Sequence, residues 1–307
     1  MSADEDSAPG LEIDEERDSG SPSSSIIPPP AGGHPSYQAG QVVVTPPESI
    51  FFRWVSAVVR LISELGQLSR MGVGALQAGT RRPFEGKAII QQIEAVGVAS
   101  LWIVFVSSLF IGMVMSVQFA FGLRKFGGME YTPRVIALSF AREMAPTMMA
   151  VIVGGRIGAG MAAEMGSMAV TEQIDAVRAL GADPLKKLVF PRLIATIFVL
   201  PLLSGIALVL GVGGAMLVAH TQFGIDANFF LRSALNTVTM MDFLSGILKT
   251  PVFGALIALI GCHLGMNTRG GTAGVGASTT RAVVAISISI FVADFFLTRL
   301  LIIAWPS

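Results

Sequence analysis

The sequence predicts an all-α integral membrane protein: five transmembrane helices, an amphipathic helix before them, and a short helix between two of the spans. The chain has 307 residues, 52% of them hydrophobic, with a mean hydropathy of +0.67. Only 14% of the residues are charged, about half the usual proportion of soluble domains. Several apolar stretches exceed the ~20 residues that a helix needs to cross a bilayer. This composition excludes a disordered protein, a nucleic-acid-binding protein with a basic surface, and most soluble enzymes.

Residues 1–48 are expected to form a disordered tail before a membrane domain of residues 49–307. Residues 1–20 hold eight acidic side chains and one basic one, and residues 21–48 are rich in Pro, Ser and Gly. Such a segment buries too little apolar surface to offset the entropy lost on ordering. It also lacks the basic and apolar regions of a secretory signal peptide. The formal net charge of zero hides an asymmetry, because residues 21–307 hold 20 bases against 13 acids.

Residues 51–79 predict an amphipathic helix, with Arg and other polar side chains recurring every three or four positions opposite an apolar face rich in aromatics. A helix of this kind lies in the membrane interface or packs on a core, and we favour the interface because strongly apolar chain follows. The expected spans cover residues 96–123, 134–160, 193–219, 243–266 and 282–305.

The distribution of basic residues sets the expected orientation. With the N-terminus inside, the inner segments hold 14 Lys and Arg side chains, and the outer segments with the far end of the last span hold five. The N-terminus is therefore expected in the cytoplasm and the C-terminus outside.

Motifs for catalysis within this chain are missing. The sequence has no phosphate-binding loop, no G-x-S-x-G and no H-E-x-x-H. Its one cysteine, Cys262, excludes an internal disulfide, and His220 and His263 end apolar spans. We expect no metal site.

Charged side chains inside the spans are the more informative feature. Arg142 and Glu143 interrupt the second span, Lys249 lies in the fourth, and Asp294 and Arg299 lie in the fifth. A charge at the centre of a membrane helix costs about 2.5–3.5 kcal/mol on insertion scales, so it needs a partner or a wet cavity. Arg142, Glu143 and Lys249 either neutralise one another or line a polar cavity for a charged ligand, and nearby prolines favour a broken helix there.

Small residues recur at four-residue spacing in the second span and allow another helix to approach closely. They are Gly154, Gly158, Ala162 and Gly166. The sequence leaves open whether this ladder packs within one subunit or between subunits.

A short amphipathic helix is predicted at about residues 172–181. Thr171 is the expected N-cap, with Glu172 in the first turn, and Gly181 ends the helix. Ile174, Val177 and Leu180 share one face, which suits docking onto a cytosolic partner.

Four motifs together resemble the permeases of MlaE-type ABC lipid transporters. They are residues 163–176 followed by Asp183-Pro184; residues 110–114 with Gln118; residues 142–146; and residues 274–276 with 279–284. The resemblance covers about residues 50–305, and the acidic tail departs from the family pattern.

The resemblance implies a homodimer bound to two cytoplasmic ABC ATPase subunits and to an MCE-domain hexamer on the periplasmic side. ATP and Mg²⁺ would be bound by the ATPase chain, with no cofactor in this one, and the substrate would be phospholipid. Transport between the inner membrane and the MCE channel or outer membrane would maintain outer-membrane lipid asymmetry. The location would be a bacterial inner membrane, with no nucleic-acid partner.

The resemblance also implies roles for particular residues. The expected ATPase-coupling helix includes Glu172, Gln173, Ile174, Asp175, Val177, Arg178 and Leu180. The expected lipid cavity includes Arg142, Glu143 and Lys249 with the apolar residues Phe110, Met113, Val114 and Val117. A permease for sterol or other hydrophobic cargo, a secondary transporter without an ATPase, and a structural membrane protein remain as alternatives.

Overall fold

The computed structural model describes residues 50–80 and 86–304, with side chains from residue 63 onward except residue 65. The predicted tail, residues 1–48, lies outside the described residues. Within them every regular element is a helix, so the predicted all-α class is confirmed. Five segments are long and apolar enough to cross a membrane: Gly86–Arg124, Met129–Val170, Leu185–Phe223, Met240–Met266 and Gly271–Ala304.

Most of the helices are longer than the predicted spans, because polar turns extend them beyond the apolar stretches on which the predictions were based. The first span is α2 (Gly86–Arg124), and the second is divided into η1 (Met129–Tyr131), α3 (Thr132–Ser139), the π-helix η2 (Phe140–Met148) and α4 (Met149–Val170). The third joins the π-helix η3 (Leu185–Val189) to α6 (Phe190–Phe223), and the last two are α8 (Met240–Met266) and α9 (Gly271–Ala304). Outside the spans lie α1 (Ile50–Gly79), α5 (Gln173–Ala179) and α7 (Ala227–Thr237).

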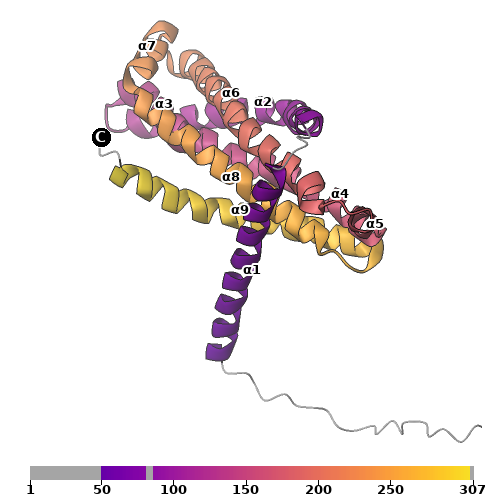
Figure 1. The fold of residues 1–307 in the computed structure, drawn as a ribbon. Coiled ribbons are helices and arrows are strands. Elements are labelled where there is room, and N and C mark those ends of the chain that lie inside the picture. The colour runs from indigo at the N-terminus through magenta and orange to yellow at the C-terminus, as the bar shows by residue number, and fades with distance from the viewer. Residues whose placement is uncertain (1–49, 81–85, 305–307) are drawn as a thin grey trace, which may run out of the picture. The chain divides into compact units, whose positions relative to one another are not determined.

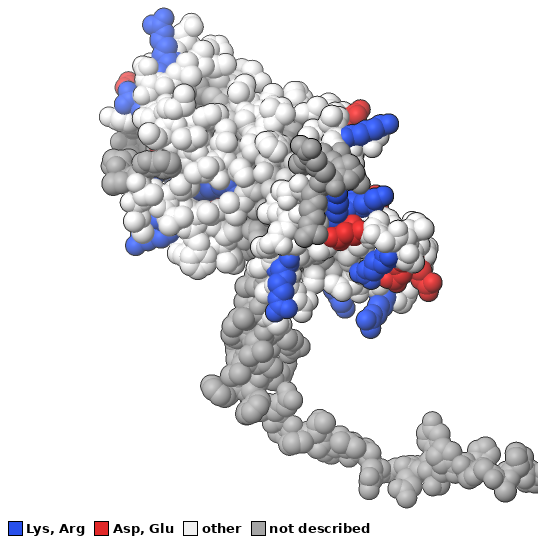
Figure 2. Space-filling model, viewed as in Figure 1, with Lys and Arg blue, Asp and Glu red and all other residues white. Residues whose placement is uncertain are grey.

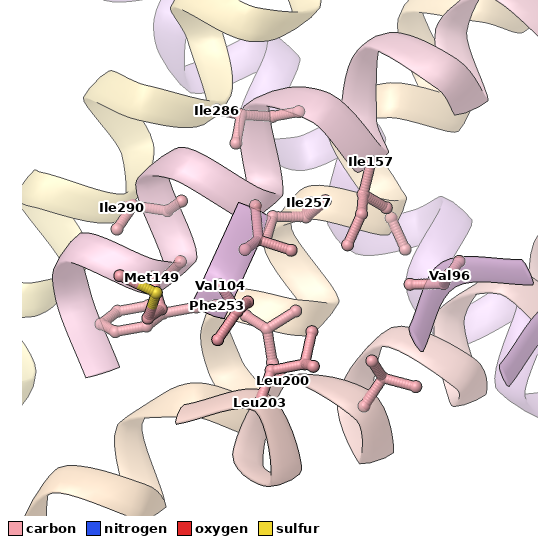
Figure 3. Packing of buried hydrophobic residues seen from close by; sticks show 14 of the residues in the cluster. Val96, Val104, Met149, Ile157, Leu200, Leu203, Phe253, Ile257, Ile286 and Ile290 are labelled. Atoms are coloured by element: carbon pink, nitrogen blue, oxygen red, sulfur yellow. The ribbon is translucent and has the colours of Figure 1, made fainter. Parts of the chain in front are cut away.

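The spans form a bundle with α4, α6 and α8 at its centre (Figure 1). Helix α4 packs on α8 and α9, α6 packs on α8, and α2 packs along α6. Branched side chains such as Ile157, Ile257 and Ile286 interdigitate between α4, α8 and α9 (Figure 3). In the most apolar part of α9 only 11% of the residues are buried, against 50% in the second span, so α9 lies at the edge of the bundle.

The contact between α2 and α6 depends on a row of mostly small side chains. The buried residues of α2 recur every four positions, namely Val96, Ser100, Val104, Ser108, Gly112, Ser116 and Ala120. A Cβ added at Gly112 would overlap the backbone of Gly211 on α6. Ser100 and Ser108 donate to the carbonyl oxygens four residues earlier, both at 2.6 Å, which satisfies their hydroxyls inside the bundle. The two helices therefore approach closely without burying an unpaired polar group at these two positions.

The small-residue ladder of the second span lies within the subunit. An added Cβ at Gly154 or Gly158 would meet isoleucine side chains of α8 and α9, and one at Gly166 would meet Thr268. Ala162 is fully buried and its backbone lies against Gly265 of α8. This ladder thus brings α4 against its neighbours in the same chain.

Helix α1 packs on the bundle through its C-terminal part, where Ala75 is fully buried. Gly72 lies against Leu259 of α8 and Gly79 against Phe190 of α6. The side chains that predicted an interfacial face precede residue 63 and lie outside the description, so that expectation stays a prediction.

Charge is distributed as a membrane protein requires. On the face shown in Figure 2, charged side chains gather at the end that includes α5, and a smaller group lies at the opposite end. The surface between them is almost entirely uncharged. The uncharged zone matches the apolar spans, which cross the bundle between these ends.

Candidate functional site

A buried lysine lies at the centre of the polar groups inside the bundle. The side chain of Lys249 is only 2% exposed, and its Nζ lies 2.8 Å from Oε2 of Glu143 and 3.1 Å from Oδ1 of Asp294. It also donates to Oγ1 of Thr298 at 2.6 Å and to the carbonyl oxygen of Arg142 at 3.2 Å. Thr298 donates in turn to Oε1 of Glu143 at 3.3 Å. We call Glu143, Lys249, Asp294 and Thr298 the Lys249 cluster; it joins η2, α8 and α9.

The cluster depends on the local backbone of η2. This segment is a π-helix, whose i→i+5 turns are frequent at functional sites, and Pro146 within it has no N–H to donate. Gly246 of α8 lies so close that an added Cβ would overlap the carbonyl oxygen of Ala141. Because Gly246 is less than one turn before Lys249, this close approach brings the lysine to Glu143.

Arg142 points to a different partner. Its Nη1 lies 3.6 Å from Oδ1 of Asp242, and its side chain is 31% exposed. Oδ2 of Asp242 accepts from the backbone N–H and the hydroxyl of Thr239, at 3.0 and 2.7 Å, in a capping box that starts α8. Arg142 is therefore the more accessible of the two cations, since its ion pair is long and its side chain is partly open.

The structure brings together part of the predicted set. Glu143 and Lys249 are in direct contact, as the neutralising interpretation expected, whereas the Arg142 side chain turns away and only its carbonyl oxygen meets Lys249. Asp242, Asp294 and Thr298 were not assigned from sequence. Asp294 is visible there as a carboxylate within the last span, but nothing in the sequence pairs it with Lys249.

The four apolar residues expected to line a lipid cavity lie on α2. Phe110 and Val114 are each 58% exposed, Val117 is 38% exposed and Met113 is half-buried. Because the opposite side of α2 packs on α6, these residues form an outer face of the single subunit and not the wall of an enclosed space.

The predicted coupling helix divides into an inner and an outer face. Ile174 is 4% exposed and Val177 is half-buried, so they hold α5 (Gln173–Ala179) to the permease. Leu180 is 85% exposed, and Gln173 and the Asp175–Arg178 ion pair of 2.7 Å are also on the surface. The predicted common docking face of Ile174, Val177 and Leu180 is therefore split between the two sides.

The expectation that Thr171 caps this helix is wrong. Its hydroxyl donates to the carbonyl oxygen of Ser167 at 2.8 Å, one turn back along α4. The N-cap position is occupied by Glu172, which has a left-handed backbone (φ 58°) and makes no capping hydrogen bond with its side chain. Gly181, with φ of +76°, ends the helix as predicted.

The end of the bundle next to α5 is held by an ion pair between two spans. Nη2 of the buried Arg192 on α6 lies 2.6 Å from Oε1 of Glu164 on α4. Nη1 of Arg192 also donates to the carbonyl oxygen of Leu188 at 2.6 Å. The ion pair holds together α4 and α6, the two spans that precede and follow α5 in the chain.

No group of three or more His, Cys, Asp or Glu side chains able to hold a metal ion occurs among residues that the structure describes. The cluster's chemistry is that of ion pairs and hydrogen bonds, which can recognise a polar head group or fix helices to one another.

The profile of the permease MlaE family matches residues 89–300. The chain is 40% identical over 212 residues to a probable ABC transporter permease of Synechocystis, covering 69% of this chain and 81% of that protein. It is also 40% identical over 209 residues to Protein TRIGALACTOSYLDIACYLGLYCEROL 1, chloroplastic, of Arabidopsis thaliana, covering 68% of this chain and 60% of that one. A probable ABC transporter permease of Rickettsia bellii is 36% identical over 242 residues, covering 79% of this chain and 93% of its own. With its five apolar spans and more than half of its length matched, the chain belongs to the MlaE family of ABC transporter permeases.

Proposed function

We propose that this chain is the membrane-spanning subunit of an ABC transporter that moves phospholipid between a bacterial inner membrane and a periplasmic MCE-protein channel or the outer membrane. Such transport would maintain the lipid asymmetry of the outer membrane. The functional unit would be a homodimer with two cytoplasmic ATPase subunits and an MCE-domain hexamer. ATP and Mg²⁺ would be bound by the ATPase chains, and lipid would be the only small molecule bound by this chain.

The observation that supports this proposal most directly is the accessible guanidinium of Arg142, which is adjacent in sequence to the Glu143 that pairs with the buried Lys249. A guanidinium forms strong, directional hydrogen bonds with phosphate oxygens. The name of the Arabidopsis relative contains that of a galactolipid, which favours lipid as the class of cargo.

In this mechanism Arg142 meets the phosphate, and the Lys249 cluster fixes the helix turn that presents it. Lys249 itself is enclosed by Glu143, Asp294 and Thr298, so it acts as a positioning residue. Acyl chains would lie against apolar faces such as that of Phe110, Met113, Val114 and Val117, once a second subunit covers them.

Movement would be driven from the cytoplasmic side. The exposed face of α5, with Leu180 and the Asp175–Arg178 pair, would enter the groove of the ATPase, and Ile174 and Val177 would transmit its displacement to the bundle. The Arg192–Glu164 pair links the two spans next to α5 and would make them move together.

The proposal is tested by Arg142→Gln in the complex purified from membranes. We expect phospholipid co-purification and ATP-dependent phospholipid transfer to fall about tenfold, equivalent to ~1.4 kcal/mol of lost head-group binding. Arg232→Gln, an exposed arginine on α7, is the matched control and should behave as wild type. Wild-type transfer by Arg142→Gln would overturn the role of this residue, and the absence of phospholipid from the wild-type complex would favour sterol or other hydrophobic cargo.

Purification of the wild-type chain also separates the classes of transporter. An ATPase and an MCE-domain protein should accompany it. Transport that persists without any ATPase, driven by an ion gradient, would favour a secondary transporter.

A further inference from the structure

A second feature of the bundle lies apart from the Lys249 cluster, at the end opposite α5. Helices α3, α6, α7 and α8 line a partly open cavity of about 590 Å³, which is within the range of about 300–1,000 Å³ found for ligand pockets. Its lining contains no charged side chain. Representative lining residues are Ala137, Val212, Met216, Leu231, Leu235 and Phe243.

The cavity is unsuited to water. Thr239 supplies the only side-chain hydroxyl in the lining, and that hydroxyl already donates to Asp242 at 2.7 Å. A buried water needs two to four polar partners. The rim is apolar and exposed, since Val209 is 72% exposed and Leu235 69% exposed, so it opens toward hydrocarbon in a membrane. An empty cavity would forfeit dispersion contacts along its whole lining, so a hydrocarbon group should fill it.

The size of the cavity favours a flexible chain over a protein helix. A helix is about 10–12 Å across with a pitch of 5.4 Å, so a single turn already occupies about 400–600 Å³. The cavity of about 590 Å³ is comparable with one or two such turns, far short of the ~20 residues of a membrane-spanning helix. A lipid acyl chain is narrower and can bend to fill it.

One end of the cavity lies close to charge. Thr239 lines the cavity and bonds to Asp242, and Asp242 is the ion-pair partner of Arg142. A lipid tail that enters between α6 and α7 would therefore be connected to the guanidinium of Arg142 through Thr239 and Asp242. The positive charge of this guanidinium is complementary to a phosphate.

We propose that this cavity binds one acyl chain of a phospholipid whose phosphate is directed toward Arg142. The head-group contact rests on the proposed function, whereas the tail site is tested by itself. Beyond the proposed function, the tail site is a specific binding site for an acyl chain at the outer end of α6.

The chain offers a matched pair of variants on one helix. Gly213 lines the cavity and an added Cβ there meets no atom within 4 Å, so the backbone accepts a side chain and Gly213→Leu places one at the cavity. Gly205 of α6 has equally open surroundings and does not line the cavity, so Gly205→Leu is the control. Both changes replace a glycine with a better helix former.

The experiment uses the full chain in membranes with its co-purifying partners. Phosphatidylethanolamine with a diazirine in one acyl chain is photolysed, and adducts are mapped by mass spectrometry. In wild type and Gly205→Leu, we expect adducts in residues 208–216 and 231–243 to exceed those on the exposed face of α9 at least fivefold. In Gly213→Leu the excess should be lost.

Equal labelling of Gly213→Leu and wild type would overturn the tail site. So would cavity labelling no higher than that of α9, which is the result expected if a partner protein filled the cavity. Normal transfer by Arg142→Gln would overturn the proposed role of Arg142, whereas loss of the adducts in Gly213→Leu would still support the tail site.

Discussion

At the residue scale, Lys249 is the charged side chain that depends most on its ion-pair partners. It is buried and pairs with two partly exposed carboxylates, so its removal would leave Glu143 and Asp294 without their common counter-charge. Breaking a buried ion pair by removing one partner costs about 3–5 kcal/mol. The sequence identified Lys249 and Glu143 because charges are rare in apolar spans. It did not identify Thr298, since a hydroxyl in a membrane helix has no distinctive pattern.

Lys249→Met should therefore destabilise the permease by about 3–5 kcal/mol, while the triple change with Glu143→Gln and Asp294→Asn should recover much of the loss. The measurement is the rate at which a maleimide reaches Cys262, the chain's single cysteine, which is fully buried and so reports unfolding. Lys187→Met, at an exposed position, is the control. A Lys249→Met protein as protected as wild type would contradict the structural importance of the cluster.

At the element scale, the five spans were predictable because each contains a long apolar run, and their number is confirmed. Two other features were not predicted. The π-helix η2 is stabilised by contacts with α8 that no local pattern reveals. The buried row of α2, from Val96 to Ala120, could have been found, because its small residues recur every four positions. The cap of α5 was assigned to Thr171 from preference alone, yet the threonine hydroxyl bonds back along α4.

The division of α5 into two faces gives a second prediction. Leu180→Asp should abolish co-purification of the ATPase and leave the permease as stable as wild type, because Leu180 is 85% exposed. Ile174→Asp should destabilise the permease itself by about 2–5 kcal/mol, because it places a charge where the side chain is 4% exposed. Pull-down and thiol protection of Cys262 separate the two effects. A Leu180→Asp chain that retains its ATPase would exclude this face as the coupling surface.

At the scale of the whole molecule, the distribution of charge predicts the orientation. With the N-terminus inside, the inner segments would hold 14 basic side chains and the outer ones with the far end of α9 five. The five spans among the described residues would place the two ends of the bundle on opposite sides. We expect Lys187→Cys, in η3, to be cytoplasmic and Lys125→Cys, after α2, to be periplasmic. Both positions are exposed, whereas Cys262 is buried.

A membrane-impermeant maleimide added to spheroplasts, in which the outer membrane is opened, should thus label Lys125→Cys alone. Lys187→Cys should react only after the inner membrane is permeabilised. Labelling in the reverse order would invert the topology and place α5 away from any cytoplasmic ATPase.

The π-helix η2 has one further consequence, which concerns the rotation of α4 about its axis. Each residue of an α-helix turns it by about 100°, since a turn contains about 3.6 residues. A π turn runs from i to i+5 and so takes up one residue more than an α turn. If the nine residues Phe140–Met148 wound as ordinary α-helix, each residue taken up in this way would rotate α4 by about that angle relative to α3. Gly154 and Gly158 would then face away from α8 and α9, and bulkier side chains would take their place. The π turns of η2 thus set which face of α4 meets α8 and α9.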